Sequence, residues 1–299
     1  MTDALERSLD ILACPLCGGS FGTSTFGTST FGVGSRSLRC ENGHAFDIAR
    51  QGYASLTIGG GPHHHGDTAE MVAARGRHLA RGHYAPIADA IAKAFAEHAN
   101  TSTSTGTGNG PSGWCVELAG GTGYYAAHVL DARPRMHGLT LDVSKNAARA
   151  AARTHPRLAS ATGDVRALLP IASAQVDLVL SIFGPRRGDE VARVLAADGE
   201  VIVVTPREAH LAQLRERFAL LAIGADKQAR LIEAMQPLQP AGTVDLDYVV
   251  DLTPADVVDS IMMGPNAFHR ERADIEELAR ALPDTLSTSV AVTISRFRH

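Results

Sequence analysis

Residues 114–125 are WCVELAGGTGYY, and this stretch decides the fold. A short apolar run, 114–118, leads into a loop of small residues, 119–123, after which the chain is expected to turn helical at Tyr124. A loop without Cβ atoms lets backbone N–H groups at the start of a helix approach a ligand closely. The stretch therefore predicts a strand, a ligand-binding glycine loop and a helix.

Strand and helix patterns alternate after this loop. Strands are expected at 136–142, 158–161, 176–183, 200–205, 243–250 and 287–297, and helices at 124–130, 144–153, 188–197 and 208–235. Strands that alternate with helices imply right-handed crossovers and a doubly wound sheet, with the ligand at the carboxyl ends of the strands. We therefore expect an α/β fold with a Rossmann-like sheet.

The composition is that of an ordinary globular protein, with 299 residues, 44% of them hydrophobic, and a formal net charge of -4. That charge argues against gripping nucleic acid by bulk charge, although local basic faces remain open. No apolar run reaches transmembrane length, and the N-terminus MTDALERSLD is charged, unlike a signal peptide. We expect a cytoplasmic chain without a membrane partner, whose four cysteines are not disulfides.

Two ligand pairs lie near the N-terminus. Cys14 and Cys17 form C-x2-C, and Cys40 and His44 form C-x3-H. Two such pairs can close a tetrahedral zinc site with no open position, which makes the site structural rather than catalytic. The alternative is a set of reduced thiols paired only in sequence. Between the pairs, the repeat FGTSTFGTSTFG over 21–32 carries too little apolar variety for a core and is expected to be a mobile ribbon tip.

The segment between this ribbon and the glycine loop contains two expected helices. Asp67 and Glu70 are spaced as a helix cap and its partner, and a second, Ala-rich helix is expected at 87–98. The three histidines of GGGPHHHG fit a flexible connector better than a metal site. We divide the chain into a zinc ribbon at 1–58, a linker with helices at 59–113 and the sheet domain at 114–299.

The glycine loop fits two kinds of cofactor. Gly121, Gly123 and Ala126 satisfy the dinucleotide pattern G-x-G-x-x-G/A, and Asp142 ends the second strand, where an acid takes ribose hydroxyls. Glu117 discriminates between the two kinds of cofactor, because a buried carboxylate would repel a pyrophosphate and attract a cation. S-adenosylmethionine carries both a sulfonium and an ammonium, so these residues suit it better than NAD. Asp164 either accepts from the adenine amino group or caps its own turn.

Several motifs together resemble one family. CPLC with C-x3-H, FDIARQGYASL, GDTAEM, ARGHYAPI, VELAGGTGYY, LDVSK and VTPREAHL are similar to those of bacterial 23S rRNA (guanine-N1)-methyltransferases. The resemblance covers nearly the whole chain. It implies a Rossmann-like S-adenosylmethionine methyltransferase sheet with a small N-terminal zinc ribbon that helps recognise 23S rRNA. It also implies methylation of a guanine in hairpin 35 (guanine 748). Within the family, it implies membership of the branch whose members give resistance to tylosin-like or mycinamicin-like macrolides.

The resemblance also implies roles for single residues. It makes Cys14, Cys17, Cys40 and His44 zinc ligands, and it makes Tyr84, Gly121, Thr122 and His210 cofactor contacts. Together with the residues argued above, the predicted cofactor-binding set is Tyr84, Glu117, Gly121, Thr122, Gly123, Asp142, Asp164 and His210. The chain departs from the family in its FGTST repeat, in AGGTG where relatives have GCGEG, and in IFGPRR where relatives have an IYAPC-like stretch.

The chemistry that these predictions require is positioning of guanine N1 and stabilisation of the charge that develops on the base. The sequence does not identify the base that accepts the N1 proton. Asp47 and His210 both lie in family motifs, and a structural role is the default interpretation of Asp47. Phe183, Tyr124 or Tyr125 could stack on the target guanine or belong to the core. The phosphate contacts expected for RNA, or alternatively a solvated face, are Arg75, Arg77, Arg81, Arg186 and Arg187.

Three functions follow as hypotheses. The first is a zinc-containing rRNA guanine-N1 methyltransferase, expected to be a homodimer because one small ribbon offers little RNA surface. The second is a zinc-bearing NAD-linked oxidoreductase, and the third is a non-catalytic RNA-binding protein with a degenerate pocket.

Overall fold

The computed structural model describes residues 2–21, 37–58, 66–101, 113–224 and 227–299. Most of the FGTST repeat, the three histidines 63–65 and the linker 102–112 lie outside the described residues.

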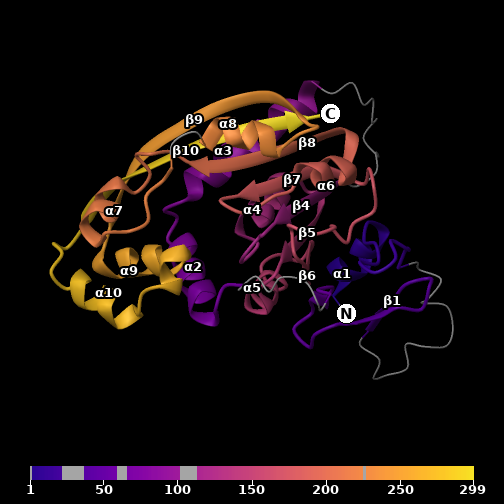
Figure 1. The fold of residues 1–299 in the computed structure, drawn as a ribbon, viewed down its shortest axis with the longest axis horizontal. Helices are drawn as coiled ribbons and strands as arrows, with labels where there is room; N and C mark the ends of the chain where they lie inside the picture. The colour runs from indigo at the N-terminus through magenta and orange to yellow at the C-terminus, as the bar shows by residue number, and fades with distance from the viewer. Residues whose placement is uncertain (1, 22–36, 59–65, 102–112, 225–226) are drawn as a thin grey trace.

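One sheet of eight strands organises the described chain (Figure 1). Its order is β3-β6-β5-β4-β7-β8-β10-β9. The strands are β3 Ala54–Ser55, β4 Trp114–Leu118, β5 His137–Asp142, β6 Leu158–Thr162, β7 Val176–Ile182, β8 Leu195–Pro206, β9 Gln239–Leu252 and β10 Leu286–Arg298. Pairing is parallel from β3 to β8, and β10 is antiparallel to both β8 and β9. The predicted doubly wound α/β sheet is confirmed, with an antiparallel edge added.

The helices flank this sheet. They are α1 Asp3–Arg7, α2 Ala69–Ala80, α3 Ala85–Thr101, α4 Tyr124–Ala132, α5 Lys145–Ala151, α6 Gly188–Val194, α7 Ala212–Phe218, α8 Lys227–Ala234, α9 Pro254–Met262 and α10 Arg272–Ala279, with 3-10 turns η1 Ser8–Asp10 and η3 Pro265–Phe268. The hydroxyl of Thr68, not the carboxylate of Asp67, caps α2 by accepting from Met71 N–H at 3.2 Å. In the described part of the chain no helix is long and apolar enough to cross a membrane.

The single helix predicted over 208–235 is wrong. Helix α7 ends at Phe218, the next residue, Ala219, has φ of 49°, and α8 begins only at Lys227. Contacts from the C-terminal segment replace helical hydrogen bonds, since Arg270 donates to Phe218 O at 2.7 Å and Leu221 N–H donates to Asn266 Oδ1 at 3.1 Å. The helix predicted at 188–197 also ends early, because Leu195 already pairs with Val176 in the sheet.

Each face of the sheet has its own apolar core. Alternate residues of β4 point to opposite faces, so that Val116 and Cys115 enter different clusters. Val116 packs in the cluster that contains Phe21 and Leu38 of the ribbon, and Cys115 packs in the cluster that contains Ile91 of α3. The ribbon core is therefore continuous with one face of the sheet.

A third apolar cluster lies at the C-terminal helices. It joins α7, α9 and α10 through residues such as Leu214, Val257 and Ile275, and it includes Ala74 of α2. Figure 1 shows these helices at the opposite end of the molecule from α1 and the ribbon strand β1 (Ser37–Arg39), on the side toward which β7 and β8 point. The carboxyl ends of the strands thus face this helical unit, which we call the C-terminal unit (α7, α9, η3 and α10).

Candidate functional site

The glycine loop after β4 makes a tight, left-handed turn. Gly121 and Gly123 have φ of 55° and 75°, and Gly123 N–H closes the turn on Gly120 O at 2.8 Å. A Cβ at Gly121 would lie 2.8 Å from Arg75 Nη1, and one at Gly123 would lie 2.7 Å from Leu158 Cδ2. Both positions therefore favour glycine through their left-handed backbone, and a side chain at either would also displace the end of a neighbouring side chain.

A cavity of about 630 Å³ lies at the carboxyl ends of the strands. The structure brings seven of the eight predicted cofactor-binding residues into its wall: Tyr84, Glu117, Gly121, Thr122, Asp142, Asp164 and His210. The eighth, Gly123, starts α4 and packs toward Leu158 of β6 instead of lining the cavity. Residues from five separate parts of the sequence thus share one site.

Glu117 is a buried acid at this site, 2% exposed. Its Oε2 accepts from the Ala126 N–H of α4 at 3.0 Å. Burial raises the pKa of Glu117 to about 8, and the neighbouring Asp142 carboxylate adds to the rise. The carboxyl is therefore mostly protonated at neutral pH, and a cation placed beside it would favour the charged form.

Two further acids line the cavity from the next strand ends. The carboxylate of Asp142 accepts from Gly121 N–H at 2.9 Å and from Ser144 N–H at 2.8 Å, so it ties the glycine loop to β5. Burial raises the pKa of Asp142 as well. Asp164 accepts from Arg166 N–H at 2.9 Å, which makes it a turn cap that also lines the cavity.

An aromatic group forms another wall. The ring of Phe183 lies 5.6 Å from that of His210 and 6.1 Å from that of Tyr84, measured between centroids. His210 Nδ1 accepts from Ala291 N–H at 3.3 Å, so the neutral ring carries its proton on Nε2, 3.3 Å from the hydroxyl of Tyr84. Phe183 has φ of 55° and is 41% exposed, which presents an aromatic face at the end of β7.

The C-terminal unit supplies a wall that the sequence did not predict. Ser260, Met263 and Phe268 line the cavity from α9 and η3. The only sequence signal for this unit was the capping box that begins α9 at Thr253, with Asp256 three residues later.

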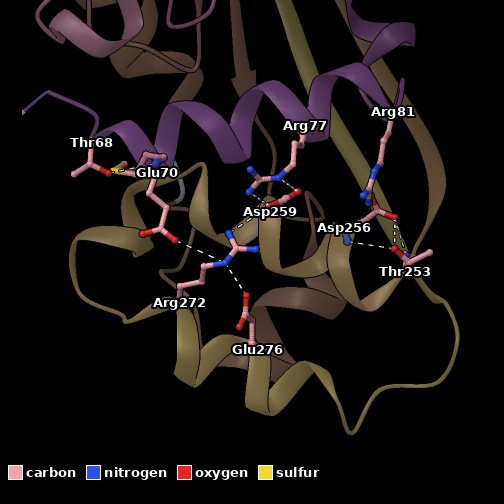
Figure 2. Close-up of polar contacts among 10 residues, drawn as sticks. Thr68, Glu70, Arg77, Arg81, Thr253, Asp256, Asp259, Arg272 and Glu276 are labelled. Atoms are coloured by element: carbon pink, nitrogen blue, oxygen red, sulfur yellow. Dashed lines mark hydrogen bonds and ion pairs between the residues drawn. The ribbon is translucent and has the colours of Figure 1, made fainter.

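The arginines of α2 have carboxylate or carbonyl partners. Arg77 donates two hydrogen bonds to the carboxylate of Asp259 in α9 (Figure 2), at 2.8 Å from Nε and 2.6 Å from Nη2. Arg81 pairs with Asp256, on the same helix α9. Arg77 and Arg81 therefore fasten α2 to the C-terminal unit, and their contact with RNA phosphates stays a prediction.

The four predicted zinc ligands gather at the ribbon. Their ligand atoms lie within 4.8 Å of one another, with Cys17 Sγ and Cys40 Sγ 3.8 Å apart and His44 Nδ1 3.5 Å from Cys40 Sγ and 3.6 Å from Cys14 Sγ. Zinc–sulfur bonds of about 2.3 Å at tetrahedral angles place two sulfurs about 3.8 Å apart. Asn42 donates to Cys17 Sγ at 3.3 Å and so supports that ligand. The predicted three-cysteine, one-histidine site fits zinc.

The comparisons with known proteins agree with both halves of this description. Residues 12–57 match the family model for the zinc ribbon of RlmA, N-terminal. A protein of Micromonospora griseorubida that carries the name of a 23S rRNA (guanine-N1)-methyltransferase is 41% identical over 292 residues, which cover 96% of this chain and 97% of that protein. The 23S rRNA (guanine(748)-N1)-methyltransferase of Streptomyces fradiae is 35% identical over 285 residues, covering 95% of each chain.

Among solved structures, a chain in the complex of the Haloferax volcanii Trm112 methyltransferase activator with a methyltransferase aligns with a TM-score of 0.46 at 17% identity. The alignment covers 78% of this chain and 99% of that one. The resemblance found in the sequence motifs is thus confirmed by relatives that match nearly end to end. This chain belongs to the 23S rRNA (guanine-N1)-methyltransferase family.

Proposed function

We propose that this protein transfers a methyl group from S-adenosylmethionine to N1 of a guanine in hairpin 35 of 23S rRNA, at guanine 748. The observation that carries the proposal is the end-to-end similarity to the Streptomyces fradiae enzyme, which is named for that nucleotide and that atom. Family membership favours this function over a NAD-linked oxidoreductase and over a non-catalytic RNA-binding protein. We also propose resistance to tylosin-type and mycinamicin-type macrolides, which follows if the modified guanine lies in their binding site.

The cavity residues fit the cofactor. When bound, S-adenosylmethionine supplies an electrophilic methyl group on a sulfonium. Glu117 meets the cationic part and ionises fully as it does so, Asp142 takes the ribose hydroxyls, and Asp164 accepts from the adenine amino group. The missing Cβ at Gly121 leaves room for the guanidinium of Arg75, whose Nη1 would lie 2.8 Å from a Cβ at that position.

The aromatic wall fits the target base. Phe183 offers an exposed face for a guanine that has left its stack, as enzymes that modify bases require. His210 presents Nε2–H toward Tyr84 because its Nδ1 is taken by Ala291 N–H. In this tautomer His210 is a hydrogen-bond donor, so it orients Tyr84 and does not accept the N1 proton.

The zinc ribbon and the oligomeric state complete the proposal. The ribbon, with Cys14, Cys17, Cys40 and His44 around a structural zinc ion, contacts the RNA, and the chain acts as a homodimer. A dimer doubles the RNA surface that one small ribbon offers. Sedimentation equilibrium of the purified protein tests the dimer directly.

Methyl transfer to defined RNA tests the function. The purified protein is incubated with labelled S-adenosylmethionine and 23S rRNA from a strain that lacks this modification. We expect incorporation of one methyl group per RNA and a reverse-transcriptase stop immediately 3′ of guanine 748, since a methyl on N1 blocks Watson–Crick pairing. A stop at another nucleotide would contradict the assigned target, and absence of incorporation would contradict the assigned activity.

A further inference from the structure

Arg75 of α2 lies inside the cavity wall, directly on the glycine loop. A Cβ at Gly121 would meet its Nη1 at 2.8 Å and its Cζ at 3.6 Å, so the guanidinium covers the residue that the loop leaves bare. The side chain is 26% exposed, which leaves it open to the cavity. A cation therefore lies beside the loop at which cofactor-binding residues gather.

The guanidinium is held from two sides. Its Nη2 donates to Met263 O of the C-terminal unit at 2.7 Å, and its Nη1 pairs with Asp67. A guanidinium has five N–H donors in a fixed plane, and these two contacts among the described residues use two of them. The group is thus positioned by the protein while donors remain for a ligand.

The charges that line the cavity indicate what the Arg75 guanidinium could bind. Glu117, Asp142 and Asp164 line the cavity and suit the cationic parts of S-adenosylmethionine, but its methionine part also carries a carboxylate, which acids repel. Burial raises the pKa of both Glu117 and Asp142, and the positive charge of Arg75 opposes that rise at both carboxyls, as expected of a cation that lines the same cavity. Planar guanidinium donors match a carboxylate in two parallel hydrogen bonds.

Arg166 also lines the cavity, but it follows β6 beside Asp164, to which its backbone N–H donates at 2.9 Å, and so lies at the acid proposed for the adenine amino group. Three further arginines near the site have partners within the protein. Arg215 also lines the cavity but donates to the backbone carbonyls of His210, at 3.0 Å, and of Glu208. Arg77 of α2 and Arg81, the residue that follows α2, pair with α9 carboxylates and do not line the cavity. Arg77 is therefore a matched comparison for Arg75, since both tie α2 to α9 and only Arg75 faces the site.

We infer that Arg75 binds the methionine carboxylate of S-adenosylmethionine and so selects the cofactor against analogues that lack this carboxylate. The inference rests on the proposed function and adds a specificity-determining residue to it. Together, Glu117 and Arg75 would recognise the two charges of an amino acid, one from the end of β4 and the other from α2.

Binding measurements on the full-length protein test this inference. Titration calorimetry compares S-adenosylmethionine with its decarboxylated form, which keeps the sulfonium and the amine, for the wild type, Arg75→Gln and Arg77→Gln. Hydrogen bonds to a charged group contribute about 1.5–3 kcal/mol, so Arg75→Gln is expected to weaken S-adenosylmethionine about 10- to 100-fold. The decarboxylated form should change by less than about threefold, and Arg77→Gln should preserve the preference of the wild type.

The outcomes separate the inference from the function. Equal weakening of both ligands by Arg75→Gln, or loss of the preference in Arg77→Gln, would show that the arginine acts only through packing of α2 on α9. Equal affinity of the wild type for the two ligands would overturn the inference and leave the function intact. A wild-type protein that binds neither ligand would refute the proposed function itself. Thermal melts of each variant confirm that it is folded.

Discussion

Cofactor binding should release a proton, because it places a cation beside a buried acid. The pKa of Glu117 is raised to about 8 in the unliganded protein, so at pH 7 about one carboxyl in eleven is ionised. A ligand that requires the ionised form is then bound about tenfold more weakly at pH 7 than at high pH, a difference of about 1.4 kcal/mol. Affinity should therefore rise with pH and level off above about pH 8.

The magnitudes are measurable. Between pH 6 and pH 8 the ionised fraction of Glu117 rises from about one in a hundred to about one half, so the Kd should fall about 50-fold. Calorimetry at pH 7 in two buffers of different ionisation enthalpy should find release of about 0.9 proton per S-adenosylmethionine bound. Glu117→Gln should abolish the release, whereas Asp164→Asn, which changes another carboxyl of the same cavity, should keep it.

A flat Kd between pH 6 and pH 8, with no proton released by the wild type, would refute the reasoning that an acid at the end of β4 receives the cation. Persistence of the release in Glu117→Gln would show that another group carries the proton. Decarboxylated S-adenosylmethionine should release the same proton as the intact cofactor, since it keeps both positive charges. That arm separates the role of Glu117 from the role inferred for Arg75.

The remaining predictions concern stability. Cys40→Ser should lose zinc by metal analysis and lower the Tm by about 4 °C or more, because Cys40 packs in the core shared by the ribbon and the sheet. Asp259→Asn should lower the free energy of unfolding in urea by about 1–3 kcal/mol, because it removes the charge that the Arg77 guanidinium binds. The loss should be smaller than for a fully buried ion pair, because Arg77 is 45% exposed and water can solvate it. In the unliganded protein, the folded state holds the Glu117 proton more tightly (pKa about 8) than the unfolded state (4.5), so stability should fall as pH rises from about 5 to 8. Glu117→Gln should lack that slope and gain about 3 kcal/mol at pH 7 in the same urea assay, and an unchanged slope would contradict the buried-acid argument.

Local patterns predicted the parts of the site that depend on local geometry. The glycine loop and each of the two pairs of zinc ligands occupy a few consecutive residues, each acid lies at or just after the end of one predicted strand, and the structure brings them together as those patterns indicate. The helix predicted over 208–235 failed for the opposite reason. Most of its residues favour a helix, and Gly224 is the one local signal of a break. The end of α7 itself depends on Phe218 O and Leu221 N–H, which bond to residues about 50 positions later, and local propensity cannot anticipate those contacts.

The arginines of α2 show what decides between two interpretations of one pattern. Arg77 and Arg81 recur at helical spacing, which is equally typical of a phosphate-binding face and of a face that pairs with acids. The distinguishing signal lies on another helix, where Asp256 and Asp259 are each no more than 3% exposed within the apolar run of α9. Two carboxylates on the buried side of an amphipathic helix are costly unless cations reach them. They therefore require basic partners from elsewhere in the chain, and Arg77 and Arg81 are those partners. Arg75 instead bonds to the backbone carbonyl of Met263, and its side chain faces the cavity.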